Sequence, residues 1–269
     1  MKERVNKMLR RLTGYQLEKP RPPKPAKPPK PPKPAPAPKK KPGLPRDYDE
    51  AAREIIGAVR PYTMTDADKL FALIEATRYV SRHGIEGDVV ECGVWRGGSM
   101  QAAARTLLAA GDTSRHLHLF DTYEGMPPPS PEDVRHDGRP AEDLLAGAER
   151  ETSKVWAVAT LEDVQEGFST VGYPAEQVHF VKGLVEETIP ESAPERIAIL
   201  RLDTDWYEST RHELEHLYPR LAPGGVLLLD DYGYWQGARQ AVDEFLEQTG
   251  ERLLLTRMAS GRIAVKPPR

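Results

Sequence analysis

Two short apolar runs, each ending in acidic residues, limit most strongly what this chain can fold into. The runs are residues 196–202 (RIAILRL) and 225–229 (GVLLL), and residues 208–221 between them have the length of a helix. This order predicts a β-α-β unit, whose strands are parallel and, when adjacent, about 5 Å apart. Four carboxylates follow the two predicted strands: Asp203 and Asp205 after the first, Asp230 and Asp231 after the second.

The carboxyl ends of parallel strands lie at one edge of a sheet, where open α/β proteins bind ligands. We therefore expect Asp203, Asp230 and Asp231 to lie close together at that edge. Crowded carboxylates repel one another unless a cation joins them, and all-oxygen ligation suits Mg²⁺, Mn²⁺ or Ca²⁺ better than zinc. Single acids also end strands as helix caps or turn residues, but the two clusters together favour a metal site.

Charge and proline are unevenly distributed along the 269 residues. Residues 1–46 hold 15 of the 38 Lys and Arg residues, 2 of the 41 acidic residues and 13 of the 26 prolines. Their net charge is therefore +13, against −16 for residues 47–269. The sequence predicts a basic amphipathic helix (1–17), a Lys/Pro-rich linker (18–46) and one catalytic domain (47–269). The acidic charge of that domain argues against nucleic acid as its substrate.

The first residues would form an amphipathic helix. Its apolar face consists of Met1, Val5, Met8, Leu9 and Leu12, and most of the basic residues lie outside that face. Such a helix can lie on an anionic membrane surface, although a frayed basic tail would have the same composition. The Lys-Pro-Pro and Lys-Pro-Ala sequence that follows predicts a polyproline II spacer reaching up to ~80 Å. We therefore expect residues 1–46 to tether the catalytic domain and to do no chemistry.

The single cysteine, Cys92, excludes an internal disulfide and is typical of a reducing compartment. No apolar run reaches the roughly 20 residues of a membrane span, and the N-terminal segment lacks the apolar part of a secretory signal. We therefore expect a cytoplasmic protein, peripheral to the inner face of the membrane where its arm binds. The sequence leaves formation of a homo-oligomer open.

Strand and helix patterns alternate along the rest of the chain. Further strands are predicted at 88–93, 116–121, 178–183, 251–258 and 260–266, and helices at 48–60, 65–83, 99–111, 141–151, 160–172 and 236–250. The alternation predicts an α/β, Rossmann-like fold with a largely parallel sheet. The last two strands are expected to form a C-terminal antiparallel pair.

The first strand and its loop, residues 88–99 (DVVECGVWRGGS), have the features of a nucleotide cradle. Gly93 lets the chain leave the strand, while Gly97 and Gly98 allow a close approach of the backbone to a ligand. The spacing differs from the dinucleotide fingerprint G-x-G-x-x-G, so the loop alone does not identify the ligand.

Two acidic residues narrow the choice of ligand. Asp121 ends the second predicted strand, where a carboxylate can accept both ribose hydroxyls of NAD(H) or of S-adenosylmethionine. Glu91, inside the first strand, can bind the amino group of methionine, for which an NAD site has no counterpart. This pair favours S-adenosylmethionine.

Five segments resemble the macrocin O-methyltransferase family: GDVVECGVWRGGSM, LFDTYEGMP, VHFVKG, LRLDTDWYEST and GGVLLLDDYGYWQGARQAVDEF. They occur in order between about Tyr62 and Phe245. Members of this family methylate sugar hydroxyls in macrolide and aminocoumarin antibiotic biosynthesis, with S-adenosylmethionine and Mg²⁺. The resemblance implies the S-adenosylmethionine-dependent methyltransferase fold, a cofactor pair of S-adenosylmethionine and Mg²⁺ (or Mn²⁺), and a small-molecule or glycan acceptor.

The resemblance also implies roles for individual residues. The metal ligands would be Asp203, Asp230 and Asp231, and the general base would be Asp205, with Asp203 as a second candidate. The cofactor would be bound by Tyr62, Thr63, Met64, Glu91, Gly93, Gly97, Gly98, Ser99, Asp121, Thr122, Lys182 and Gly183.

Other functions use parts of the same pattern. Methylation of a catechol-like diol needs the same metal geometry, and a catalytically idle ligand-binding or scaffold protein could be recruited by the basic arm.

Residues 212–216 (HELEH) match the H-E-x-x-H signature of zinc peptidases. However, His212 and His216 fall on the predicted solvent-facing side of their helix, away from any third ligand.

Overall fold

The computed structural model describes residues 1–13 and 43–268, and it contains two units, Met1–Gly43 and Leu44–Arg269. The described part of the first unit contains helix α1 (Lys2–Thr13), which lies within the helix expected over residues 1–17. The expected Lys/Pro-rich linker, residues 18–46, lies outside the described residues except at its C-terminal end. No helix among the described residues is long and apolar enough to cross a bilayer.

The second unit is built on a seven-stranded sheet, with the strand order β3-β2-β1-β4-β5-β7-β6. Its strands are β1 (Asp88–Cys92), β2 (Leu117–Asp121), β3 (Val178–Lys182), β4 (Ile197–Leu202), β5 (Leu221–Leu229), β6 (Thr256–Met258) and β7 (Gly261–Val265). The first five pair in parallel, whereas β7 is antiparallel to both β5 and β6. The predicted fold, a largely parallel α/β sheet with a C-terminal antiparallel pair, is confirmed.

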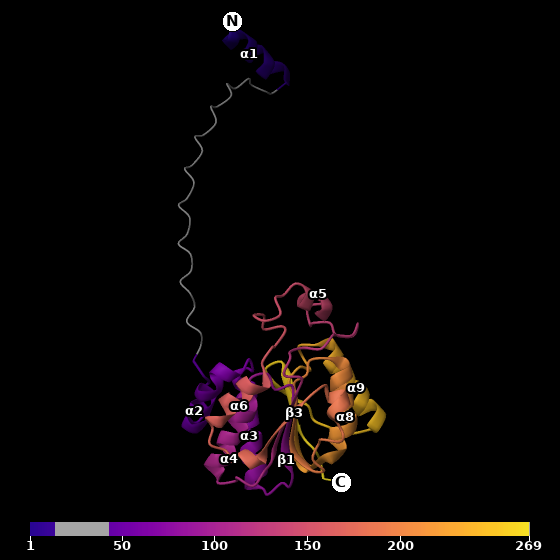
Figure 1. The fold of residues 1–269 in the computed structure, drawn as a ribbon. Coiled ribbons are helices and arrows are strands. Elements are labelled where there is room, and N and C mark those ends of the chain that lie inside the picture. The colour runs from indigo at the N-terminus through magenta and orange to yellow at the C-terminus, as the bar shows by residue number, and fades with distance from the viewer. Residues whose placement is uncertain (14–42, 269) are drawn as a thin grey trace. The chain divides into compact units, whose positions relative to one another are not determined.

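Helices cover both faces of this sheet, as Figure 1 shows. One face packs against α3 (Ala67–Arg82), α4 (Gly98–Ala110) and α6 (Leu161–Ser169), with α2 (Glu50–Val59) outside them. The other packs against α7 (Val185–Thr188), α8 (Tyr207–Leu217) and α9 (Gln236–Thr249). Short 3₁₀ turns occur at Arg60–Tyr62, Ala175–Gln177 and Tyr218–Arg220. A short α-helix, α5, spans Ala141–Ala146.

Both faces of the sheet are buried by helices. Neighbouring residues in a strand point to opposite faces, so both kinds of position must be apolar. Val89 belongs to the apolar cluster formed with α3 and α4, and Val90 to the cluster formed with α8 and α9. Cys92 is also fully buried, in the second cluster. Continuous apolar runs, rather than alternating ones, are the pattern that such a sheet requires.

Several elements differ from the predicted ones. Helix α5 ends at Ala146, with Gly147 as its C-cap, so the helix expected over 141–151 is only 6 residues long. The Pro223-Gly224-Gly225 turn lies inside β5, where the register against β4 shifts between Ile197 and Ile199. The one-turn helix α7 was not predicted because four residues carry too little periodicity to be recognised.

The strand order places a crevice between β1 and β4. From β1 the chain moves outward through β2 and β3, and from β4 it moves the other way through β5. The loops that follow β1 and β4 therefore diverge at the carboxyl edge of the sheet, which is where doubly wound proteins bind ligands. The carboxyl ends of these two strands hold the residues on which the candidate site depends.

Candidate active site

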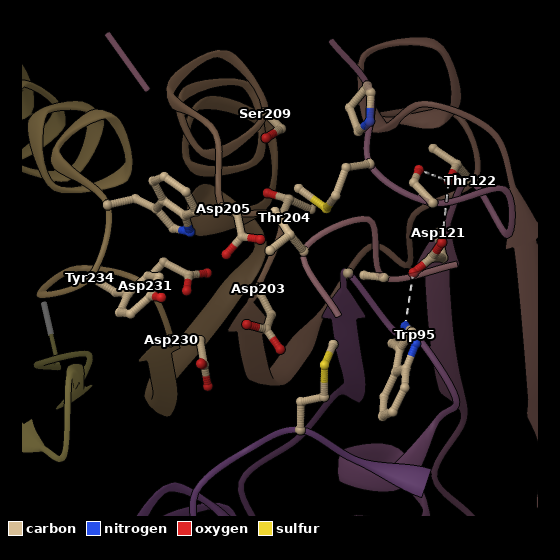
Figure 2. Close-up of a pocket in the computed structure, with 18 of the residues that line it drawn as sticks. Trp95, Asp121, Thr122, Asp203, Thr204, Asp205, Ser209, Asp230, Asp231 and Tyr234 are labelled. Carbon is tan, nitrogen blue, oxygen red and sulfur yellow. Dashed lines mark hydrogen bonds between the residues drawn. The ribbon is translucent and has the colours of Figure 1, made fainter. Parts of the chain in front are cut away.

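The predicted acidic residues lie together at the carboxyl edge of β4 and β5 (Figure 2). The main-chain N–H of Asp203 donates to the carbonyl of Cys92 in β1, and that of Asp230 donates to the carbonyl of Leu202 in β4, each at 2.9 Å. These bonds extend the parallel hydrogen-bonding pattern by one residue beyond the strands. The backbone positions of both acids are therefore fixed by the sheet.

A turn after Asp203 brings a third carboxylate to this place. Asp205 has a left-handed backbone with φ 68°, a conformation that Asp and Asn adopt more readily than most residues. One carboxylate oxygen from each of Asp203, Asp205 and Asp231 lies within 4.8 Å of the other two. This is the one group of three His, Cys, Asp or Glu residues in residues 1–13 and 43–268 with the spacing of a metal site.

Two buried cations hold the neighbouring carboxylates. Arg201, in β4, is only 3% exposed and donates to Glu91 of β1, to Asp203 at 2.7 Å and to Asp230. Lys69, in α3, donates to the other oxygen of Asp230. Both oxygens of Asp230 are thus occupied by basic side chains, and this residue is not part of the three-carboxylate cluster.

The carboxylates at the site outnumber its basic side chains, so the site can accept a divalent cation. The site contains five carboxylates, those of Glu91 and the four aspartates, and its two basic side chains pair with three of them, Glu91, Asp203 and Asp230. Burial and neighbouring negative charge raise the pKa of Asp231, and burial, opposed by Arg201, raises that of Asp203. Burial alone would also raise the pKa of Asp230, but Arg201 and Lys69 hold it below its usual value. An oxygen-rich cluster with excess negative charge fits Mg²⁺ or Mn²⁺.

Asp205 has the character of a base that works near neutral pH. Burial and the charge of Asp203 raise its pKa to about 7. A carboxyl group with such a pKa can accept a proton at neutral pH and return it, as general base catalysis requires.

The loop after β1 packs tightly against the end of β4. Gly93 has φ +83°, and a Cβ atom there would lie 2.1 Å from the main-chain oxygen of Asp203. A side chain at this position would therefore force apart the two strand ends that form the site.

Asp121 organises the loop from the neighbouring strand. Its Oδ2 accepts the N–H groups of Val94 and Trp95 at 2.7 and 3.0 Å, and its Oδ1 accepts that of Tyr123 at 2.7 Å. The bond to Trp95 is drawn in Figure 2. Asp121 thus holds together the loops after β1 and β2, which form one wall of the crevice.

A cavity of about 400 Å³ lies between the carboxylate cluster and the loops after β1 and β2. The predicted cofactor residues that line it are Met64, Gly93, Asp121, Thr122 and Gly183, and the acids are Asp203, Asp205, Asp230 and Asp231. Met126 and Leu144, together with Val155, Tyr234 and Trp235, form an apolar part of its wall. One continuous cavity therefore joins a nucleotide-type loop to a carboxylate cluster.

Comparison with known proteins identifies this combination. The sequence profile of the macrocin O-methyltransferase (TylF) family matches residues 42–258. This chain belongs to that family. The family consists of S-adenosylmethionine-dependent methyltransferases, so the chain is an S-adenosylmethionine-dependent O-methyltransferase, as the sequence motifs implied.

Individual relatives act on sugars attached to natural products. A tetracenomycin-C rhamnosyl 4'-O-methyltransferase from Streptomyces olivaceus is 37% identical over 207 residues, 77% of this chain and 72% of the relative. Mycinamicin III 3''-O-methyltransferase from Micromonospora griseorubida is 34% identical over 189 residues, 70% of this chain and 72% of the relative. The solved structure of the O-methyltransferase NovP covers 77% of this chain and 83% of its own, at 31% identity and a TM-score of 0.66.

Glu91 lies inside β1, as expected, but it does not line the cavity. It is 1% exposed, and its Oε1 accepts a hydrogen bond from Arg201. The physical reason is its register: Glu91 and Arg201 are directly opposite each other on β1 and β4. One carboxylate oxygen is therefore a cross-strand partner of an arginine, while Oε2 has no partner among the described residues, and binding of the methionine amino group by Glu91 stays a prediction.

Other predicted cofactor residues also lie outside the cavity wall. A Cβ on Gly98 would lie 2.5 Å from the Tyr62 carbonyl oxygen, so this glycine makes room for the chain itself rather than for a ligand. Gly97 likewise faces Val164 of α6. The remaining four contact other parts of the protein. The Tyr62 ring lies 5.4 Å from the Arg96 guanidinium, the Thr63 hydroxyl accepts from Thr65 N–H, the Ser99 hydroxyl bonds to the Thr65 hydroxyl, and Lys182 pairs with Glu124.

The H-E-x-x-H match does not form a metal site. His212 Nε2 hydrogen-bonds to the carbonyl oxygen of Ile189 at 2.9 Å. His212 and His216 are half-buried rather than on the outer face, while Glu213 is completely buried. The rings of His212 and His216 lie with their centroids 4.4 Å apart, but neither histidine belongs to a metal-type cluster among the described residues.

Sequence reasoning missed Lys69 and Arg201. Arg201 could have been found, because a charged residue inside the apolar run AILRL must be buried and therefore paired. Lys69 carries no comparable signal, since it occupies a helix that has many polar residues.

Proposed function

We propose that this O-methyltransferase uses a divalent metal ion to methylate a hydroxyl of a sugar or glycoside. The observation that carries the proposal is the cluster of Asp203, Asp205 and Asp231 in the wall of the same cavity as Gly93 and Asp121. The relatives' names, which describe methylation of sugar hydroxyls, support the acceptor class.

The chain's residues suit methyl transfer to oxygen. A divalent cation would be held by Asp203 and Asp231, and when bound it would lower the pKa of an acceptor hydroxyl. Asp230 completes the ligand set implied by the motifs, and its contacts with Lys69 and Arg201 compete with that role. Asp205 would take up the acceptor's proton as the acceptor oxygen bonds to the methyl carbon of S-adenosylmethionine; the carbon–sulfur bond would break and its electron pair would go to sulfur, which leaves as a neutral thioether. The strand ends align the reacting groups, which supplies part of the rate.

The apolar wall of the cavity suits the remainder of a glycoside. Trp235 packs edge-to-face on the buried Trp206, with ring centroids 4.9 Å apart. Asp133, which is buried, accepts the N–H of Tyr207 at 2.7 Å and thereby fixes the loop after β2 to the start of α8. The aromatic wall is therefore rigid, as a surface that stacks on a sugar ring should be.

The acceptor class is tested by incubating the protein with S-adenosylmethionine, Mg²⁺ and two kinds of diol, a rhamnoside and a catechol. We expect mass spectrometry to detect one added methyl group on the sugar, complete loss of product with EDTA and its recovery with Mg²⁺. Transfer to the catechol alone would replace the proposed acceptor. Binding of S-adenosylmethionine without turnover on either diol would favour a scaffold protein.

The general base is tested by Asp205→Asn. Asparagine tolerates the left-handed backbone of this position, so the turn should be preserved while the proton acceptor is lost. We expect kcat to fall on the order of 10²–10⁴-fold with Mg²⁺ affinity retained. A rate within threefold of the parent would instead assign the base role to Asp203.

A further inference from the structure

Helix α1 exposes an apolar face. The side chains of Met1, Val5, Met8 and Leu12 are 107, 47, 67 and 74% exposed. At about 100° per residue these four positions, with Leu9, fall within an arc of roughly 100°. Four large apolar side chains on one side of a short helix, all in contact with water, indicate a surface that becomes covered in a complex.

Basic side chains border this apolar arc. Arg4 and Arg11 follow it along one side of the helix, and Lys7 and Arg10 lie nearly opposite. All four are exposed, and none forms an ion pair with another described residue. An apolar stripe bordered by exposed cations is the arrangement of helices that lie in the interface of a lipid bilayer.

We propose that α1 binds the surface of an anionic lipid bilayer. Leu12, near the centre of the arc, and Met8, at its edge beside the arginines, enter the boundary between headgroups and acyl chains, while the basic side chains contact anionic headgroups. A nucleic acid would also attract the charge of +13 carried by residues 1–46, but it would leave the apolar arc in water. The two features together therefore favour a membrane over a polyanion.

The proposed surface is separate from the catalytic machinery. The family profile begins at residue 42, and the cavity is lined by residues from Met64 onward. The net charge of residues 47–269 is −16, so the catalytic unit itself is repelled by an anionic bilayer. Membrane binding must then come from the arm, and changes in α1 should leave catalysis on a dissolved acceptor unaltered.

The full-length protein is tested by sedimentation with vesicles of phosphatidylcholine alone and of phosphatidylcholine with phosphatidylglycerol. We expect binding to the anionic vesicles at low salt and a marked loss near 0.5 M salt, because exposed charges are then screened within a few ångströms. Equal binding to both kinds of vesicle, or no binding to either, would overturn the proposal. The second result would indicate that the arm pairs with the acidic catalytic unit.

Two variants separate the apolar and electrostatic contributions. Met8→Ala/Leu12→Ala keeps the charge and the helix propensity, and we expect its vesicle affinity to fall at least about tenfold. Lys7→Gln/Arg10→Gln keeps the apolar arc, and it should weaken binding roughly fivefold per charge removed. Unchanged vesicle affinity of the alanine variant would show that charge alone acts and would overturn the proposed role of the apolar arc. In every variant kcat should equal that of the parent.

Discussion

Replacing Asp203 by asparagine is expected to abolish methyl transfer while the affinity for S-adenosylmethionine stays within about threefold of the parent. Asp203 belongs to the three-carboxylate cluster, and its side chain also accepts a hydrogen bond from Arg201. Asparagine can still accept that bond, but it removes a negative charge from the group that would hold the metal. Isothermal calorimetry with S-adenosylmethionine and an assay over a range of Mg²⁺ concentrations measure the two properties separately.

Asp112→Asn is a matched control for this experiment. Asp112 is also partly buried and paired with an arginine, Arg115, but it lies just before β2, at the opposite edge of the sheet. This variant should retain activity and its response to Mg²⁺. If Asp203→Asn lost cofactor affinity but remained active and dependent on Mg²⁺, the assignment of Asp203 to the metal site would be wrong.

The fold could be predicted from sequence because its signals are local and repeated. Strands β1, β4 and β5 are short apolar runs with a glycine or acid at their end, and each is followed by a helix-length segment. The β-α-β rule then places residues 203 and 230 at one edge without any knowledge of contacts. The same rule predicted the convergence of Asp203 and Asp231, which the structure shows.

The partners of these acids could not be predicted in the same way. The cross-strand pairing of Glu91 with Arg201 depends on the register of β1 against β4, which a sequence leaves open. The contact of Lys69 with Asp230 joins residues 161 positions apart in the chain. The approach of Tyr62 to Gly98 likewise depends on how the turn before α3 packs on α4. Such contacts follow from packing rather than from periodicity.

Arg201 is therefore the residue whose loss we expect to affect stability most. Arg201→Met would leave the buried carboxylates of Glu91, Asp203 and Asp230 without their shared cation. Breaking a buried ion pair in this way typically costs about 3–5 kcal/mol, because charges remain in the interior without a partner. Urea denaturation of the ligand-free protein should show the free energy of unfolding reduced by this amount.

Arg96→Met provides the comparison, because the Arg96–Asp163 pair is about one-third exposed on both sides. Exposed pairs contribute at most about 1 kcal/mol, so this variant should be nearly as stable as the parent. Adding Glu91→Gln to Arg201→Met should restore part of the stability, since it removes one of the charges that Arg201 neutralises. A loss of less than about 1 kcal/mol in Arg201→Met would mean that the carboxylates are neutral in the folded protein. In that case protonation of the carboxyl groups, rather than the charge of Arg201, would prevent their mutual repulsion at the carboxyl ends of β1, β4 and β5 before a cation binds.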